Sequence, residues 1–332
     1  MVPYSTLGRF SMLDSPTPVE ATSGSRAVKS PNLAIDIAGI RMKNPITVGS
    51  GTYGHHGNFS QFFSVEEMGA LVPKTIRNYR WPGNPAPRVH EVTGGLHSSV
   101  GIPSNDWETF ISKDAQILES LELPVIQSVI GRTEDEYVEM VEKCSDLGIF
   151  AGLELNLSCL NLKQGGLDFG YDPIAAEKLV KRARKASNIP IIAKLAPDYS
   201  SLATVAKAVE GAGADAIALV NAPRAMCIDY KTRRPIIGNK IGALSGAAIK
   251  PMAVYMIWQL YQTVNIPLFG MGGVTDYRDA VEFMAAGARS VAFGTINYVD
   301  PMAIPKAIKD LEQYLVEAGI DDVNDLVGSA HL

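Results

Sequence analysis

A short loop in the middle of the chain carries the residues best suited to acid–base chemistry. An apolar run ends at Asn156, and the chain continues through Cys159 and Asn161 to the pair Gly165-Gly166. A thiol, whose pKa is ordinarily about 8.5, can be tuned to remove a carbon-bound proton near neutral pH. Asparagine amides both donate and accept hydrogen bonds, so they could hold a flat polar ring. The segment therefore predicts a mobile loop that carries a cysteine base over a ligand.

Other polar side chains close apolar runs in the same way. Lys74 and Lys194 each end a run that otherwise has the pattern of a buried strand. A single lysine in such a place commonly extends to solvent, whereas two of them favour a site that holds negative charge. The residues at such strand ends are Ser50, Lys74, Ser128, Asn156, Lys194, Asn221, Gly272 and Gly294.

Two glycine clusters late in the chain suggest a phosphate site. One is Gly270-Met271-Gly272-Gly273, and the other is Gly294-Thr295. Glycines let backbone N–H groups approach phosphate oxygens, and a following helix N-terminus adds a favourable dipole. Tight turns would explain either cluster alone, but two clusters after neighbouring strands predict phosphate binding.

These residues must be positioned by a repeating unit that begins at Ile46. Short apolar runs alternate with amphipathic stretches, which predicts a parallel sheet buried on both faces. Eight such units predict a closed (β/α)₈ TIM barrel, an α/β fold in one domain over residues 31–332. The expected strands are residues 46–50, 70–75, 124–130, 152–158, 190–195, 216–221, 267–270 and 290–294. The expected helices are residues 133–147, 173–186, 202–213, 247–263, 277–286 and 302–318.

Two long insertions interrupt this rhythm, at residues 78–105 and 223–244. Both follow predicted strands, so they should lie at the C-terminal face of the barrel, where insertions usually build or cover an active site.

Composition limits the classes of function. With 30 basic and 35 acidic residues the net charge is −5, which argues against nucleic-acid binding. The 3 cysteines are too few for a disulfide framework or a cysteine-based metal site. No apolar run reaches the roughly 18–20 residues that span a bilayer. Residues 1–30, rich in Ser, Pro, Thr and Gly, are expected to form an N-terminal extension, and the protein is expected to be cytoplasmic.

The same residues resemble a known family. Asn156-Leu157-Ser158-Cys159, followed by Asn161, is similar to the N-x-S-C-P-N signature of class 1 dihydroorotate dehydrogenases. Residues 163–166 and 228–233 are most similar to the B-type branch of that family. Further similar segments follow in the family's order: Asn44-Pro45, Gly49 through Gly54, Lys74-Thr75, Asn84 through Arg88, Ala193-Lys194-Leu195, Asn239-Lys240, Leu244-Ser245-Gly246, Gly270 through Gly273 and Gly294-Thr295.

The resemblance implies an FMN-dependent oxidation of dihydroorotate to orotate in pyrimidine biosynthesis. Cys159 is implied as the base that takes a ring proton while a hydride leaves the neighbouring carbon, and Lys194 as the cation beside the flavin ring. The implied substrate residues are Lys74, Ser98, Asn156, Asn161 and Asn221. The implied FMN residues are Ser50, Gly51, Lys74, Ser128, Asn156, Lys194, Ser245, Gly246, Gly272, Gly273, Gly294 and Thr295.

The implied assembly is a homodimer core joined by a subunit that carries FAD and an iron–sulfur cluster and passes electrons to NAD. No metal site is expected in this chain itself.

The chain departs from the family pattern around the substrate. Leu160 stands where the family has proline, Ser98 and Ser104 replace asparagines, and Ala222 replaces a hydroxyl residue. Each lost hydrogen bond to a buried polar group could cost about 1–3 kcal/mol. A related FMN oxidoreductase that acts on another dihydropyrimidine-like or cyclic amide substrate is therefore the alternative. A non-redox barrel with a phosphorylated ligand, and a binding subunit without catalysis, are two further hypotheses.

Overall fold

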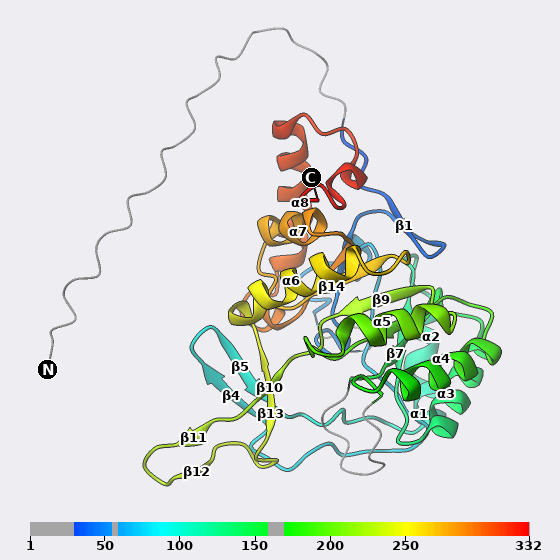
Figure 1. Cartoon of the computed structure of the whole chain (residues 1–332), viewed down its shortest axis with the longest axis vertical. Coiled ribbons are helices and arrows are strands. Elements are labelled where there is room, and N and C mark those ends of the chain that lie inside the picture. Colours follow the sequence, from blue (N-terminus) through cyan, green and yellow to red (C-terminus); the bar gives the residue numbers. More distant parts are fainter. Residues whose placement is uncertain (1–29, 55–58, 159–168, 332) are drawn as a thin grey trace, which may run out of the picture.

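The centre of the fold is a curled parallel sheet. The structure is a computed structural model that describes residues 30–54, 59–158 and 169–331 (Figure 1). Its seven strands follow the order β3 (Ile46–Val48), β15 (Ala288–Phe293), β14 (Leu268–Met271), β9 (Ala216–Leu219), β8 (Ile191–Lys194), β7 (Gly152–Asn156) and β6 (Ile126–Val129). These runs match seven of the eight expected strands. Apart from one half-buried residue in β15, all of their residues are buried, as expected for a sheet covered on both faces.

The eighth expected strand is present in an irregular form that closes the barrel. The Gly69 N–H donates to the Ile46 carbonyl at 2.9 Å, on the β3 side. On the β6 side, the Leu71 N–H donates to the Pro124 carbonyl at 2.9 Å, and the segment makes two isolated parallel bridges to β6 and the residue before it. Pro73 lies in the middle of this segment and has no N–H to donate, which limits regular pairing. Backbone hydrogen bonds therefore join both edges of the sheet through this segment.

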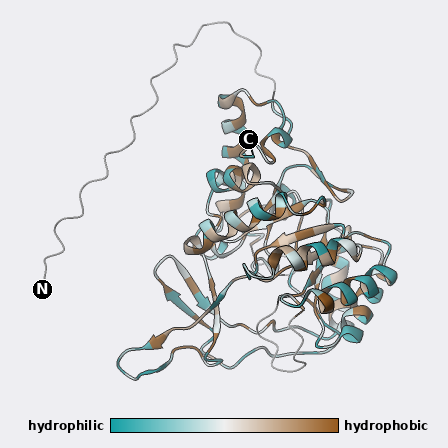
Figure 2. Cartoon of the chain, viewed as in Figure 1, coloured by the Kyte–Doolittle hydropathy of each residue, from teal (hydrophilic) through white to brown (hydrophobic). Residues whose placement is uncertain are grey.

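Helices cover the outside of the barrel (Figure 1). The expected helices are confirmed, with ends shifted by up to three residues, as α3 (Glu134–Leu147), α4 (Pro173–Lys185), α5 (Leu202–Gly211), α6 (Lys250–Tyr261), α7 (Tyr277–Ala285) and α8 (Ala303–Ala318). Thr133, Asp172 and Asp276 cap α3, α4 and α7 by accepting backbone N–H groups. Figure 2 shows that the helices carry both teal, hydrophilic residues and brown, apolar residues.

One helical stretch was not predicted. It runs through α1 (Trp107–Phe110), a five-residue π-helical turn (Ile111–Ala115) and α2 (Gln116–Glu119), and it lies between the irregular strand and β6. Asp106 caps it by accepting the Thr109 N–H at 2.8 Å. The stretch supplies the helix that the second unit of the barrel needs.

Among the described residues, no helix is long and apolar enough to cross a membrane.

The two insertions pair with each other. The first forms β4 (Val89–Val92) and β5 (Gly95–Ser98), and the second forms β10 (Arg224–Ala225) and β13 (Gly242–Ser245). Together they make a four-stranded antiparallel sheet in the order β10-β13-β5-β4. A small hairpin, β11 (Ile228–Asp229) with β12 (Arg234–Pro235), projects from the second insertion (Figure 1). A further hairpin, β1 (Ile35–Ile37) with β2 (Ile40–Met42), precedes β3.

The expected domain division is not tested by the structure. Residues 1–29, most of the predicted extension, lie outside the described residues.

Candidate active site

A buried lysine lies at the centre of the barrel mouth. In the closed strand order, β8 and β3 face each other across the barrel. Lys194 ends β8, and its Nζ donates to the Oγ of Ser50, just beyond β3, at 3.0 Å. The same Nζ lies 3.5 Å from both carboxylate oxygens of Glu154 on β7. The lysine side chain therefore reaches across the barrel axis and places its charge there, as the sequence pattern suggested.

Asn156 ends β7 directly beside Lys194 in the sheet register. Its backbone carbonyl accepts the Tyr137 hydroxyl at 2.6 Å, which fixes this strand end against α3. Its side-chain Oδ1 is buried and has no hydrogen-bond partner among the residues that the structure describes. Buried polar atoms are nearly always satisfied in a folded protein, so this oxygen suits a bound donor group.

Asn221 is oriented by two hydrogen bonds. Its Nδ2 donates to the Ser158 Oγ at 2.8 Å, and its Oδ1 accepts the Ala222 N–H at 2.9 Å. Ser158 is the last described residue before the cysteine loop. The end of β9 is thereby tied to the start of that loop.

Lys74 lies on the other side of the mouth, in the irregular strand, and is half-buried. Burial lowers the pKa of its ammonium group, and the positive charge of Arg88 lowers it further. Gln127 donates through Nε2 to the Lys74 carbonyl at 3.1 Å. The next residue of β6, Ser128, is fully buried and shares a hydrogen bond of 2.9 Å with the Thr75 hydroxyl.

The glycine clusters and the first insertion line one cavity of about 180 Å³. Gly246 and Gly273 have left-handed φ angles of +104° and +83°. A Cβ on Gly273 would lie 2.7 Å from the Lys250 backbone nitrogen, so no side chain fits there without a shift. The lining residues are Gly94, Gly95, Gly246, Ala247, Gly273, Val274, Thr275, Thr295, Ile296 and Val299.

Not every predicted phosphate residue lines this cavity. Ser245 supports it by accepting the Thr295 hydroxyl at 2.8 Å. Gly272 and Gly294 adjoin the lining in sequence, whereas Gly51 follows Ser50 beyond β3. Gly94 and Gly95 also line the cavity but are not among the residues that the sequence predicts to bind a ligand, although a glycine pair within an insertion could indicate them.

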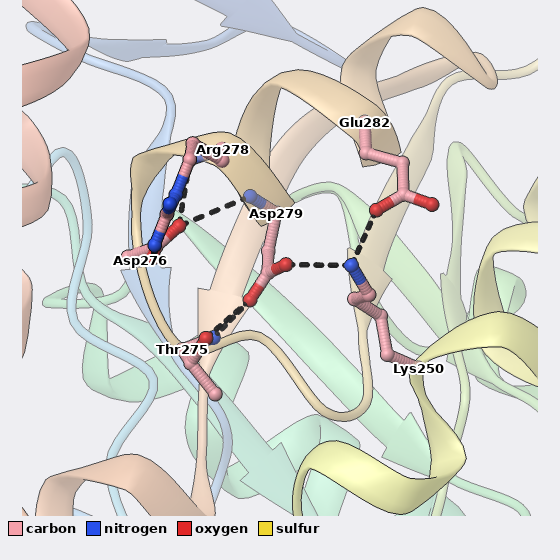
Figure 3. Close-up of polar contacts among 6 residues, drawn as sticks. All are labelled: Lys250, Thr275, Asp276, Arg278, Asp279 and Glu282. Atoms are coloured by element: carbon pink, nitrogen blue, oxygen red, sulfur yellow. Dashed lines mark hydrogen bonds and ion pairs between the residues drawn. The ribbon is translucent and has the colours of Figure 1, made fainter. Parts of the chain in front are cut away.

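A polar network supports the rim of the cavity (Figure 3). Asp279 on α7 accepts both the backbone N–H and the hydroxyl of Thr275, at 2.7 and 2.6 Å. The Lys250 Nζ, at the start of α6, lies 2.8 Å from Asp279 and 2.6 Å from Glu282. These acceptors raise the pKa of Lys250. The network therefore holds the Thr275 turn against the N-termini of two helices.

Comparison with known proteins identifies the family. The family model described as dihydroorotate dehydrogenase matches residues 32–315. The chain belongs to the dihydroorotate dehydrogenase family. It is 44% identical over 298 residues to "Dihydroorotate dehydrogenase B (NAD(+)), catalytic subunit" of Desulforudis audaxviator, covering 90% of this chain and 97% of that one. The same description applies to a relative from Geobacter metallireducens, 41% identical, covering 91% of this chain and 99% of the relative.

These relatives confirm the predicted family and its B-type branch. A solved structure, DHODH in complex with ferulenol from Eimeria tenella, has a TM-score of 0.75 at 20% identity and covers 90% of this chain and 89% of that chain. At this identity the likeness supports the fold alone, and it agrees with the predicted (β/α)₈ barrel. Dihydroorotate dehydrogenases are oxidoreductases that act on CH–CH groups and in general use a flavin.

The residues that depart from the family pattern have defined surroundings. Ser98 ends β5 and pairs with Ala243 of β13, half-buried beside the mouth insertions. Ser104 is buried, and its hydroxyl donates to the carbonyl of the next residue at 2.9 Å. The Ala222 N–H is engaged by Asn221.

The predicted base, Cys159, lies outside the described residues, as do Leu160 and Asn161. Their roles stay predictions. The other two cysteines are free: Cys144 is buried and Cys227 is half-buried. Burial raises the pKa of the Cys144 thiol, which makes it a poor base.

Proposed function

We propose that this chain is the catalytic subunit of an enzyme that oxidises dihydroorotate to orotate with FMN, in the de novo synthesis of pyrimidines. The observation that carries the proposal is the Lys194 ammonium on the barrel axis, beside the unpartnered Asn156 amide oxygen and within the mouth of a dihydroorotate dehydrogenase fold. A cation and a free acceptor at this place suit a polar ring that gains negative charge on reduction.

FMN fits the described residues in two respects. The cavity at Gly246 and Gly273 offers backbone without Cβ atoms, where a phosphate can approach N–H groups closely. The Asn156 oxygen can accept a hydrogen bond from a ring N–H. When bound, the flavin supplies the acceptor for the substrate hydride. The residues proposed to hold it are Ser50, Gly51, Lys74, Ser128, Asn156, Lys194, Ser245, Gly246, Gly272, Gly273, Gly294 and Thr295.

The substrate would lie over the mouth, between Lys74 of the irregular strand and the asparagines at and beyond the ends of β7 and β9. The Lys74 ammonium pairs with the substrate carboxylate, in the manner of a charge-assisted hydrogen bond. Asn156, Asn161 and Asn221 hold the pyrimidine edge, with Ser98 contributing a hydroxyl. Because its Nδ2 already donates to Ser158, Asn221 has a defined orientation before the substrate binds.

Cys159 is the proposed base. It takes the proton from the ring carbon next to the one that loses a hydride. The hydrogen bond between Asn221 and Ser158 anchors the chain immediately before this cysteine. Such anchoring keeps a base within reach of its proton.

The proposed assembly follows the names of the relatives. They are named as catalytic subunits of NAD(+) enzymes, which implies a further subunit in those proteins. We propose the same for this chain: a homodimer core with a subunit that carries FAD and an iron–sulfur cluster, located in the cytoplasm. Residues 1–30 would be an extension outside the catalytic domain, which spans residues 31–332.

The test is an anaerobic reduction. The purified chain is expected to absorb as a flavoprotein, and dihydroorotate without oxygen should bleach the flavin band within one turnover. A colourless protein would contradict the proposal and favour a non-redox barrel. A flavin that neither dihydroorotate nor dithionite reduces would point to a binding subunit without catalysis.

A second candidate is oxidation of another dihydropyrimidine-like or cyclic amide compound with the same flavin. It is favoured by the hydroxyl of Ser98, shorter than an asparagine amide, and by the Ala222 side chain, which has no polar atom. A panel of such compounds distinguishes the two. Bleaching by dihydroorotate alone would remove this candidate, whereas bleaching by dithionite and by another panel member, but not by dihydroorotate, would establish it.

A further inference from the structure

Glu154 is a charged residue in the buried strand β7, and neither the motifs nor the proposed chemistry uses it. We propose that Glu154 is a positioning residue that holds the Lys194 ammonium on the barrel axis and sets the net charge that a bound flavin ring meets. This inference rests on the proposed FMN binding.

The strand geometry places Glu154 directly below the mouth. Glu154 and Asn156 are two residues apart on β7, so their side chains leave the strand on the same face. Asn156 is paired with Lys194 in the register, and Glu154 is paired with Ile192, one level deeper. The carboxylate thus reaches the Lys194 Nζ from below, at 3.5 Å for both oxygens. Ser50 approaches the same nitrogen from the opposite strand.

Burial makes the two groups depend on each other. The side chains of Lys194 and Glu154 are 6% and 3% exposed. A buried charge that loses its partner is strongly destabilised, so the pair persists only as a unit. Among the ion pairs and hydrogen bonds of the described residues, Lys194 provides the one cation that contacts Glu154. The pair is therefore not a solvent-exposed surface ion pair, and its role must be sought inside the barrel.

The contacts of the Lys194 ammonium leave one of its N–H groups available to a ligand. An ammonium group has three N–H donors. Ser50 and Glu154 engage two of them, so the third remains for a group bound over the mouth. The same two contacts fix the position of the ammonium before any ligand arrives. Such preorganisation lets a charge stabilise a developing anion without first rearranging.

The negative charge of Glu154 partly cancels the positive charge of Lys194, so it should make reduction of a bound flavin less favourable. Glu154→Gln keeps an oxygen that can accept from Nζ but removes the negative charge, leaving an uncompensated cation. Removing one charge beneath the mouth where the ring is proposed to bind should alter the equilibrium for flavin reduction by about tenfold. For a two-electron couple this corresponds to a rise of about 30 mV in the midpoint potential.

The experiment is a reductive titration of the flavin in the full chain, with the wild type, Glu154→Gln and a control. Asp215→Asn is the matched control, because Asp215 pairs with Arg184 at 2.8 Å and precedes β9, at the opposite end of the barrel from the mouth. We expect a higher midpoint potential in Glu154→Gln and an unchanged one in Asp215→Asn. An unchanged or lower potential in Glu154→Gln would overturn the inference while leaving the proposed function intact. A wild type without flavin would overturn both.

A second comparison serves if Glu154→Gln does not fold or retain flavin. Lys194→Gln and the double variant Glu154→Gln/Lys194→Gln are compared, both without the buried cation. If Glu154 acts by holding the Lys194 ammonium in place, its substitution should have no further effect on the midpoint potential once that ammonium is gone. Equal potentials in these two proteins support action through Lys194. A tenfold difference in the reduction equilibrium would show that Glu154 acts independently of the lysine, against the inference.

Discussion

The two sides of the barrel mouth present different groups to a ligand, side chains on one side and backbone on the other. Around β7 and β8 the site consists of buried side chains with charge or amide groups, such as Lys194, Glu154 and Asn156. Around β14 and β15 it consists of backbone, with Gly246 and Gly273 in left-handed conformations that side chains rarely adopt. The first side can vary its chemistry by changing one side chain. The second offers only shape and N–H groups, which suits an invariant phosphate.

This contrast predicts opposite sensitivities. On the side-chain half, removing a polar group that meets the substrate should change the reaction while the flavin stays bound. On the backbone half, adding a single Cβ should release the flavin and leave the chemistry of any remaining holoenzyme unchanged. The variants that follow test that division, from the strongest expected effect to the weakest.

Loss of the cysteine base should have the largest effect. Cys159→Ala is expected to lower kcat by about 10²–10⁴-fold, the usual contribution of a positioned base, with normal flavin content. Stopped-flow bleaching by dihydroorotate measures this step. Cys227→Ser is the control, since Cys227 is half-buried and lies in the second insertion. Equal bleaching rates in Cys159→Ala and the wild type would remove the proposed base.

The next variant concerns the substrate carboxylate. Lys74→Gln should raise KM by about 10–100-fold, the value of a charge-assisted hydrogen bond of about 1.5–3 kcal/mol. Lys207→Gln, on the exposed side of α5, is the control. If KM for dihydroorotate in Lys74→Gln stays within threefold of the wild type, Lys74 does not bind the carboxylate.

The lowered pKa of Lys74 also predicts a pH dependence. Burial and then Arg88 favour the neutral amine, so the ammonium loses its proton at a lower pH than an ordinary lysine. The wild-type KM should therefore be constant at low pH and rise as pH increases through that lowered pKa, before the usual lysine range near about 10.4. A pH profile of KM in the wild type and Lys74→Gln tests this. A rise of the same size in both would assign it to another group.

On the backbone half, Gly273→Ala should reduce flavin affinity by roughly tenfold or more. A non-glycine residue held at a strained φ costs about 1–3 kcal/mol, and the new Cβ would press on the Lys250 backbone nitrogen. Gly211→Ala is a matched control, because a Cβ there meets open space. Flavin content after dialysis and ultrafiltration gives the affinity. Full retention of flavin in Gly273→Ala would break the contrast between the two halves.

The polar network in Figure 3 should have the smallest effect, and that effect is on the stability of the fold. Lys250→Met is expected to lower the free energy of unfolding by about 1 kcal/mol or less, because Lys250 is 28% exposed and solvent screens its ion pairs. Since these contacts raise the pKa of Lys250, their contribution is complete below the ordinary lysine pKa and is lost as pH rises through the raised one. Thermal unfolding measures it, with the more exposed Lys306→Met as control. A loss of several kcal/mol would contradict the screening argument.

Much of the barrel was determined by local sequence patterns. Strand and helix positions follow from apolar periodicity, which a parallel sheet buried on both faces makes continuous. Because parallel strands expose their C-terminal ends on one face, residue types at strand ends also predicted which side chains meet at the mouth. Lys194, Asn156 and Asn221 were found in this way. The glycine clusters lie at strand ends for the same reason, and Gly273 and Thr295 line the cavity there.

Other features depended on contacts between distant segments, and only the tertiary structure decided them. The pairing of β5 with β13 joins residues about 145 positions apart, and nothing local in either insertion specifies its partner. The segment from Gly69 to Ile76 closes the barrel with an incomplete ladder, because Pro73 cannot donate. In the sequence, the glutamate of a buried strand has no evident partner. The structure shows that Lys194 of the next strand pairs with Glu154. Local sequence determines which elements form, whereas the meaning of a buried charge depends on the partner that folding brings to it.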